Sequence, residues 1–138
     1  MAADTILRWI PGGKTFVTTD STGHSMVMST PDENTGMKPS ELLLSALAGC
    51  TSVDVVDILA KKRTPLTSLQ IEVSAEQDPD PPWTFRKFHM HFIVQGEGLT
   101  DKNVEQAIEL SEMKYCSVAA TIRVAAEITT SFEILPAD

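Results

Sequence analysis

The feature that most constrains the fold is a long apolar segment running from Pro39 to Arg63. Pro39 suits the first position of a helix, and Lys61, Lys62 and Arg63 suit a helical C-terminus just before Pro65. Between these ends, apolar side chains occupy most faces of the helix: Leu42, Leu43, Leu44, Leu47, Val53, Val55, Val56, Ile58 and Leu59. A helix of this kind is buried among several neighbours. The rest of the chain must therefore supply the surfaces that cover it.

Short strand-like segments lie on both sides of this helix in the sequence. The patterns predict strands over 5–10, 14–19, 25–29, 69–76, 88–94 and 128–134. They also predict a helix over 102–113, capped by Asp101, and a shorter helix from Cys116 to about Arg123. The resulting order, β-β-β-α-β-β-α-α-β, indicates an α+β fold with antiparallel sheet. The length of 138 residues suits a single domain, 1–138.

Composition and charge limit which binding partners and which cellular compartment the sequence suggests. The formal net charge of −8 argues against nucleic acid or an anionic membrane surface as a partner. No basic region precedes an apolar stretch over residues 1–13, which argues against export. The longest apolar stretch, Leu42–Cys50, is interrupted by Ser45 and is too short to span a bilayer. We therefore expect a cytoplasmic protein with no membrane partner.

The chain has only two cysteines, Cys50 and Cys116. In a reducing compartment, a thiol pair is more often catalytic, metal-binding or redox-sensing than a structural staple. Cys50 lies about 15 Å along its helix from Ser40, too far for the helix dipole to help it ionise. Cys116 is expected to begin a helix, where amide N–H groups and the nearby Lys114 favour a thiolate. Burial as two small structural residues is an equally good interpretation of the cysteines alone.

Two other polar patterns have less specific interpretations. His89 and His91 point to one side of a strand together with Lys87, opposite its apolar face. Because zinc generally needs three or four ligands in tight spacing, this pattern indicates a solvated sheet face, and we expect neither a metal nor a cofactor. Asp54, Asp57 and Lys61 follow Cys50 at helical spacing. This polar stripe is interpreted as an ion-paired surface, with a hydrated channel or a dimer contact as alternatives.

The two cysteine segments together carry a family resemblance. The pattern Pro39-x-Glu41-Leu42, then Leu47-Ala48-Gly49-Cys50, is followed some sixty residues later by Tyr115-Cys116-Ser117. This arrangement resembles the OsmC/Ohr family, named after osmotically inducible protein C and the organic hydroperoxide resistance protein. The resemblance extends over essentially the whole chain, including the strand order, and is closest to the OsmC-like branch.

The resemblance implies a fold, an activity and a set of partners. The fold would be an intertwined α+β homodimer, with antiparallel sheets wrapped around two long central helices. The activity would be thiol-dependent reduction of peroxides, especially organic ones. By position, Cys50 matches the peroxidatic cysteine and Cys116 the resolving one. The disulfide formed between them would be reduced by an external dithiol, such as a lipoylated protein.

The sequence departs from the family pattern at the groups that activate the reactive thiol. The peroxidase branches carry Glu directly after the Pro, whereas this chain has Ser40 there and Glu41 one step later. On an ideal helix Glu41 lies about 13 Å along the axis and half a turn around from Cys50. It can reach that sulfur only from a partner subunit or through a bent helix start. Similarly, Lys14 stands where the family has an Arg after a Gly-Gly turn, and Arg8 is a possible substitute.

The resemblance and the departures from it lead to two candidate functions. The first is a thiol-dependent hydroperoxide reductase in oxidative or osmotic stress defence, with Cys50 and Cys116 as the redox pair and Glu41, Lys14 and Arg8 as activating candidates. The alternative is a non-enzymatic, stress-associated dimer that binds an apolar ligand and has structural thiols. Retention of both cysteines favours the enzyme, and the altered Glu and Arg positions favour the alternative.

Overall fold

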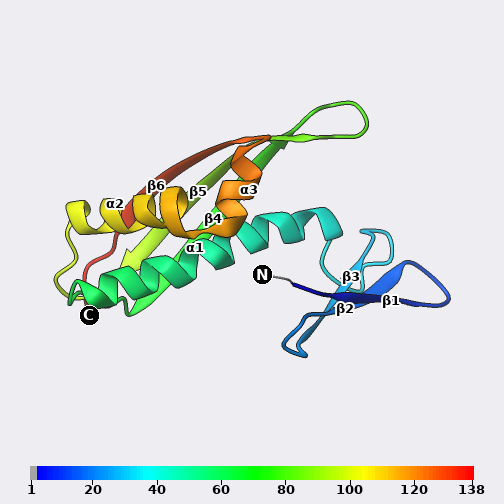
Figure 1. Cartoon of the computed structure of the whole chain (residues 1–138), viewed down its shortest axis with the longest axis horizontal. Coiled ribbons are helices and arrows are strands. Elements are labelled where there is room, and N and C mark those ends of the chain that lie inside the picture. The colour runs from blue at the N-terminus through cyan, green and yellow to red at the C-terminus, as the bar shows by residue number, and fades with distance from the viewer. Residues whose placement is uncertain (1–2) are drawn as a thin grey trace. The chain divides into compact units, whose positions relative to one another are not determined.

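The computed structural model describes residues 3–138. The chain forms two compact units, one ending at Leu43 and the other comprising Leu44–Asp138 (Figure 1). The expectation of one domain over 1–138 stays a prediction.

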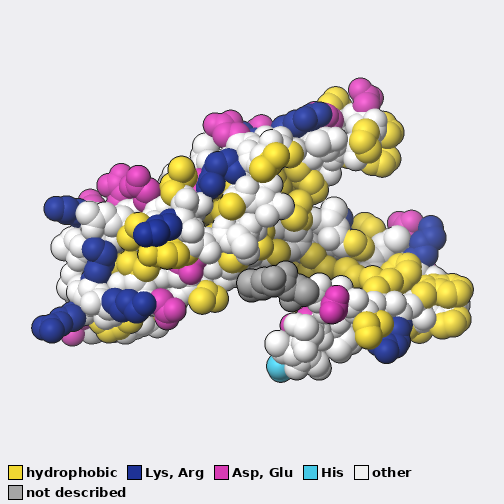
Figure 2. Space-filling view, viewed as in Figure 1, with side chains coloured by type: hydrophobic (Ala, Val, Ile, Leu, Met, Phe, Trp, Pro, Cys, Tyr) yellow, Lys and Arg dark blue, Asp and Glu magenta, His cyan; other side chains and the backbone are white. Residues whose placement is uncertain are grey.

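The N-terminal unit is a three-stranded antiparallel sheet in the order β1-β2-β3. Its strands, β1 (Ile6–Ile10), β2 (Thr15–Thr19) and β3 (Ser25–Ser29), confirm the three strands that the sequence predicts. A 3-10 turn, η1 (Pro39–Glu41), closes the unit. Large apolar side chains remain exposed on this sheet, and Figure 2 shows hydrophobic side chains gathered on the unit's surface: Ile6, Leu7, Trp9, Ile10, Met26 and Val27.

The C-terminal unit packs helices against one face of a second sheet (Figure 1). Its strands are β4 (Ser68–Gln77), β5 (Phe85–Gln95) and β6 (Glu127–Ile134), in that order across the sheet. Its helical elements are α1 (Leu42–Lys61), α2 (Asp101–Leu110), η2 (Ser111–Tyr115) and α3 (Ser117–Arg123). The core forms between these layers. It contains Leu47, Val55 and Leu59 of α1, Phe88, Met90, Phe92 and Val94 of β5, and Val104, Ala107, Ile108, Ala119 and Ile122 of the later helices.

The sheet of the C-terminal unit is mixed, which corrects the expected antiparallel pairing. β4 and β5 form an antiparallel hairpin, but β6 pairs parallel to β5, with Phe88 opposite Ile128 and Phe92 opposite Phe132. Parallel neighbours need a crossover of a dozen or more residues. Here α2, η2 and α3 provide it, so the chain enters β6 in the same direction as β5.

Helix α1 is less buried than its composition predicts. Its fully buried residues form one stripe at four-residue spacing, namely Leu47, Thr51, Val55 and Leu59. Val53 remains 63% exposed, and Val56 is exposed as well. The expectation of several neighbours is therefore met on one face of the helix only.

The helical segment Pro39–Lys61 is also longer than the apolar stretch on which the membrane argument depended. Its mean hydropathy of 1.8 and its length are sufficient, by themselves, for a membrane span. The apolar helix extends beyond Leu42–Cys50 because small polar residues such as Ser45 do not end it. Core helices of soluble proteins pass the same test, although only 22% of the apolar window is buried in this chain.

The N-terminus of α2 differs by one residue from the sequence-based expectation. Thr100, rather than Asp101, is the capping residue, and its Oγ1 accepts a hydrogen bond of 3.2 Å from the backbone N–H of Asn103. Asp101 instead lies in the first turn, where its charge interacts favourably with the helix dipole.

This correction gives a stability prediction. Thr100→Ala should lower the free energy of unfolding by about 1 kcal/mol, because it leaves a helix N–H group without its acceptor. Asp101→Asn should cost less than about 0.5 kcal/mol, because it removes only an exposed charge near the dipole. Urea unfolding of both variants measures the difference. A larger loss for Asp101→Asn would mean that the capping residue is assigned wrongly.

Candidate redox site

Cys50 lies in the middle of α1 on its half-buried side, packed against the edge of the core. Gly49 precedes it and is exposed. A Cβ atom at Gly49 would meet no neighbouring part of the chain within 4 Å. The helix surface beside Cys50 is therefore open within the chain, which leaves room for a substrate or for another chain.

Cys116 lies at the junction between η2 and α3 and is only 2% exposed. It caps α3 as the sequence predicts, and its Sγ accepts a hydrogen bond of 3.3 Å from the backbone N–H of Ala119. Its own N–H donates to the carbonyl of Ser111 over 2.8 Å. Backbone hydrogen bonds thus hold both the sulfur and the main chain of Cys116 in place.

Thr51 connects the two cysteine segments and was not singled out from the sequence. Its Oγ1 lies 3.7 Å from Cys116 Sγ and 2.8 Å from the carbonyl oxygen of Leu47. Because a hydroxyl carries one hydrogen, it donates to one of these acceptors at a time. The available signal was its position: Thr51 is the one polar residue in the otherwise apolar stripe Leu47, Val55 and Leu59, and a buried polar side chain requires a partner.

A second polar contact holds η2 against α1. Ser111 is buried, and its Oγ donates to Asp54 Oδ2 over 2.8 Å. η2 itself is a π-helical turn, whereas the sequence predicts regular helix to Met113. Such turns are rare and occur frequently at functional sites. Here the wider turn leads directly to Cys116.

Burial raises the pKa of the Cys116 thiol, and the neighbouring Cys50 thiol raises it further. The Ala119 N–H and the Thr51 hydroxyl act in the opposite direction, but they do not outweigh burial. The expectation that Cys116 has the better setting for a thiolate is therefore wrong, because its helix N-terminus lies in a dry core. Both cysteines are free thiols, and they are close enough for Cys50 to influence the pKa of Cys116.

Lys114 does not supply the charge that the sequence suggested. Its Nζ lies over the exposed ring of Tyr115, 5.3 Å from the ring centroid. Among the residues that the structure describes, no charged side chain donates a hydrogen bond to either sulfur. Any positive charge at the thiols must come from a group outside these contacts.

The other activating candidates belong to the N-terminal unit, whereas both cysteines belong to the C-terminal unit. Arg8 is exposed on β1, opposite Val17 of β2, and Lys14 is exposed at the end of the turn before β2. Glu41 forms an ion pair of 3.2 Å with Lys38 in η1. The roles of Arg8, Lys14 and Glu41 at the thiols stay predictions.

The polar stripe after Cys50 lines a cavity instead of forming ion pairs. Within residues 3–138, no ion pair joins Asp54 or Asp57 to Lys61. A cavity of about 310 Å³ is lined by these three residues together with Ile58, Lys62, Leu110 and Tyr115. The default interpretation of an ion-paired surface is therefore wrong, and these side chains instead border a recess that neither cysteine lines.

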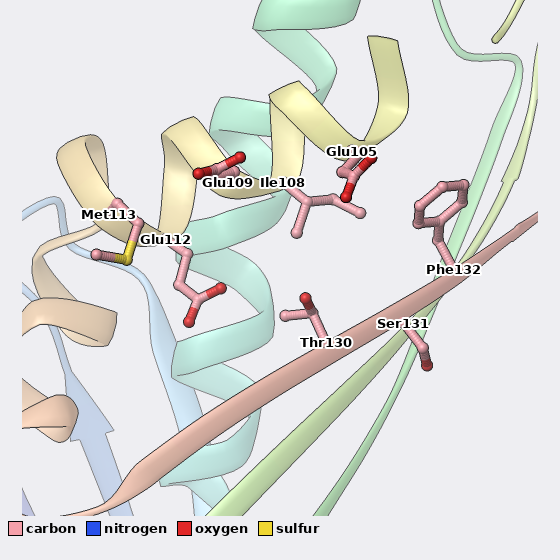
Figure 3. Close-up of a pocket in the computed structure, with 8 residues that line it drawn as sticks. All are labelled: Glu105, Ile108, Glu109, Glu112, Met113, Thr130, Ser131 and Phe132. Carbon is pink, nitrogen blue, oxygen red and sulfur yellow. The ribbon is translucent and has the colours of Figure 1, made fainter. Parts of the chain in front are cut away.

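A larger recess of about 520 Å³ lies between α2, η2 and β6 (Figure 3). Glu105 and Glu109 of α2 and Glu112 of η2 line it, and Thr130 and Phe132 point into it from β6. Glu112 is paired with Arg123 at 3.3 Å. Neither cysteine lines this recess, so it is separate from the thiol pair.

The chain is similar to several known proteins in sequence and in structure. The sequence pattern of the family described as OsmC-like protein matches residues 31–131. Protein YhfA of Escherichia coli strain K12 is 37% identical over 134 residues, covering 95% of this chain and 97% of that protein. The crystal structure of a hypothetical protein from Aquifex aeolicus is 27% identical, with a TM-score of 0.87 over 99% of this chain and 98% of that one. The organic hydroperoxide resistance protein OhrB of Bacillus subtilis shares the fold at 15% identity, with a TM-score of 0.64 over 96% of this chain and 98% of that one.

The contacts of Thr51 predict the effect of removing its hydroxyl. In a Cys50→Ser background, Thr51→Val should raise the pKa of Cys116, because the thiolate loses a donor while the side-chain shape is kept. Thiolate absorbance recorded against pH measures the change. Ser52→Ala is the matched control, because the Ser52 hydroxyl makes the same kind of bond, 2.7 Å to the carbonyl of Ala48, without touching a thiol. Identical titrations for Thr51→Val and the parent would show that Thr51 does not stabilise the thiolate.

Proposed function

The chain belongs to the OsmC-like protein family, and from this premise we propose that it is a thiol-dependent hydroperoxide reductase with Cys50 and Cys116 as its redox pair. The observation that carries the proposal is the proximity of the two free thiols. The organic hydroperoxide resistance protein of the same fold supports the choice of substrate class.

The proposed reaction has two steps. In the first, the Cys50 thiolate attacks the O–O bond of a hydroperoxide, which forms an S–O bond, gives Cys50 sulfenic acid and releases an alkoxide that is protonated to the alcohol. In the second, the Cys116 sulfur attacks the sulfenic sulfur, forms the disulfide and releases water. An external dithiol or lipoylated protein then supplies two electrons and two protons to restore both thiols.

The environments of the two thiols support this division of roles. Cys50 is half-buried beside an open helix surface, whereas Cys116 is almost fully buried. A buried thiol with a raised pKa is a poor first nucleophile, because only the thiolate attacks a peroxide efficiently. The Cys116 thiol can instead donate its hydrogen to the Cys50 thiolate. Once Cys50 is oxidised its negative charge disappears, and Thr51 and Ala119 are in place to stabilise a Cys116 thiolate.

We also propose that the activating charges come from Glu41, Lys14 and Arg8 of a second copy of the chain. The lack of a charged partner for either sulfur among residues 44–138 supports this proposal. Gly12 adopts a φ of +114°, which requires glycine in the turn that presents Lys14. Glu41 would have to exchange its ion pair with Lys38 for the new contact.

The alternative function is a non-enzymatic stress protein that binds an apolar ligand. The burial of Cys116 and the absence of the family's Glu directly after Pro39 favour it. In that case the thiols would be structural, and no peroxide would be consumed at Cys50. The two proposals therefore predict different rates of peroxide consumption.

A homodimer is the third part of the proposal, and the exposed apolar surface supports it. Val53 and Val56 of α1 remain exposed beside the open site at Gly49, and the N-terminal sheet carries its own exposed apolar side chains. Monomers rarely leave large apolar patches in water. A second α1 packed on this face would cover it. We also propose a cytoplasmic location, which membership of the OsmC-like family supports.

The first experiment measures peroxide consumption with an organic hydroperoxide and dihydrolipoamide or dithiothreitol as reductant. Wild type should turn over, whereas Cys50→Ser should fall to the rate without protein, because the attacking thiolate is gone. Without added reductant, Cys116→Ser should reduce about one peroxide per Cys50 and accumulate sulfenic acid, because no thiol is then available for the resolving step. Circular dichroism confirms that both variants fold. Equal rates for wild type and Cys50→Ser would overturn the enzymatic proposal and favour the alternative.

The second experiment tests the dimer by light scattering after size exclusion. Val53→Lys should convert the dimer to a monomer, because it places a charge in the centre of the apolar face. Val124→Lys is the matched control: Val124 is 90% exposed at the end of α3, and its substitution should leave the dimer intact. A wild-type monomer, or a dimer that survives Val53→Lys, would contradict the proposed interface.

A further inference from the structure

The outer face of the C-terminal sheet carries an ordered set of polar side chains that the redox proposal does not use. Register places these residues in cross-strand rows: Glu72, His91 and Ser131 form one row, and Ser74, His89 and Thr129 form the next. Figure 3 shows Ser131 pointing to the side of β6 away from Thr130 and the helices. This face is therefore opposite the core-facing side of β5.

A continuous series of hydrogen bonds links the side chains of β5 and β6. His89 Nδ1 lies 2.7 Å from Thr129 Oγ1, and His91 Nε2 lies 3.1 Å from Glu133 Oε2. The remaining nitrogens, His89 Nε2 and His91 Nδ1, both contact Ser131 Oγ, at 2.9 Å and 2.7 Å. Both imidazoles are partly buried, and the side chain of His91 is 30% exposed. The rings are held in fixed orientations, unlike freely solvated surface histidines.

This pattern resembles the surroundings of a metal site before the metal binds. Metal-ligating histidines usually present one ring nitrogen to the metal and bond the other to a carboxylate, carbonyl or similar group. Here Glu133 and Thr129 hold one nitrogen of each ring, and the other two nitrogens converge on the same point. That point is occupied by the Ser131 hydroxyl, which a rotation about its Cα–Cβ bond can move aside.

The charge of this face favours a cation. Glu72 lies directly across from His91, and Glu133 bonds its other side. The third row adds Glu76 and Glu127 around Lys87. A cavity of about 330 Å³, lined in part by Glu76 and Thr129, opens beside the imidazole of His89, which also lines it. Four carboxylates against one lysine make the local potential negative, which raises the concentration of cations at the site.

We propose that His89 and His91, oriented by Thr129 and Glu133, form a surface binding site for a borderline divalent cation, with Cu²⁺ bound most tightly. The two convergent imidazole nitrogens are its protein ligands, and water completes the coordination. Imidazole suits copper, nickel and zinc, and affinity for a given nitrogen site rises to Cu²⁺ across the first-row divalent metals. Because a metal replaces the proton on each ligating nitrogen, binding weakens in acid.

This proposal changes the interpretation of His89 and His91 as a solvated face. In the described residues, no group of three or more histidine, cysteine or acidic side chains is close enough to hold a metal. The site therefore depends on two histidines, with weaker or exchangeable further ligands. Such a site suits a copper(II)-type ion better than a structural zinc ion, which needs four protein ligands.

The test uses the full-length chain with Cys50→Ser and Cys116→Ser, so that the thiols cannot bind the metal and the outcome does not depend on the proposed peroxidase activity. Calorimetric titration with CuCl₂ at neutral pH should give one site. His89→Gln and His91→Gln should each weaken Cu²⁺ binding by more than about tenfold, and Glu133→Gln should weaken it up to about tenfold through His91. Electron paramagnetic resonance should show two nitrogen ligands.

His24→Gln is the matched control, because His24 lies in a turn of the N-terminal unit and bonds only Thr22 through its ring. It should leave the Cu²⁺ affinity within about twofold of the parent, since its ring is not part of the proposed ligand set. Circular dichroism shows that each variant is folded. Affinity that is unchanged by both His89→Gln and His91→Gln, or a spectrum without nitrogen coupling, would overturn the proposal.

Discussion

The rest of the structure depends on the burial of one stripe of α1 against the C-terminal sheet. Leu47, Thr51, Val55 and Leu59 recur every four residues, and each is fully buried. This spacing turns one line of the helix toward β5 and leaves the other faces outside the core. Because Cys50 precedes Thr51 by one residue, it lies at the margin of the stripe rather than within it. The same contact that builds the core therefore positions the reactive group.

Thr51 belongs both to the buried stripe of α1 and to the surroundings of Cys116. Its hydroxyl can donate a hydrogen bond to the Leu47 carbonyl or to Cys116 Sγ. A buried sulfur is costly to ionise, and the backbone N–H of Ala119 lowers that cost only in part. The two cysteines are therefore unequal for a physical reason. One lies at the edge of the core with open space beside it, and the other is almost fully buried.

The surfaces that the chain leaves uncovered are as informative as its core. Helix α1 is buried on one side only, so part of its apolar surface stays exposed. The exposed side includes Gly49 and Val53. The sheet of the C-terminal unit is organised differently, with an apolar side toward the helices and an ordered polar side formed by β5 and β6. The exposed side of α1 is the face that the proposed second copy would cover, and the polar side of the sheet is the face of the proposed cation site. The separation follows from the two-residue period of β5.

The sequence by itself determined the element order, the strands and the two cysteine motifs, because these depend on local periodicity and on residue types. It also determined which side of β5 faces the core. Tertiary structure decided the parallel pairing of β6, the capping role of Thr100 and the raised pKa of Cys116. Each of these depends on residues distant in sequence or on backbone geometry at an element's end. The hydrogen bonds that orient His89 and His91 belong to the same class, because their partners lie some forty residues away on β6.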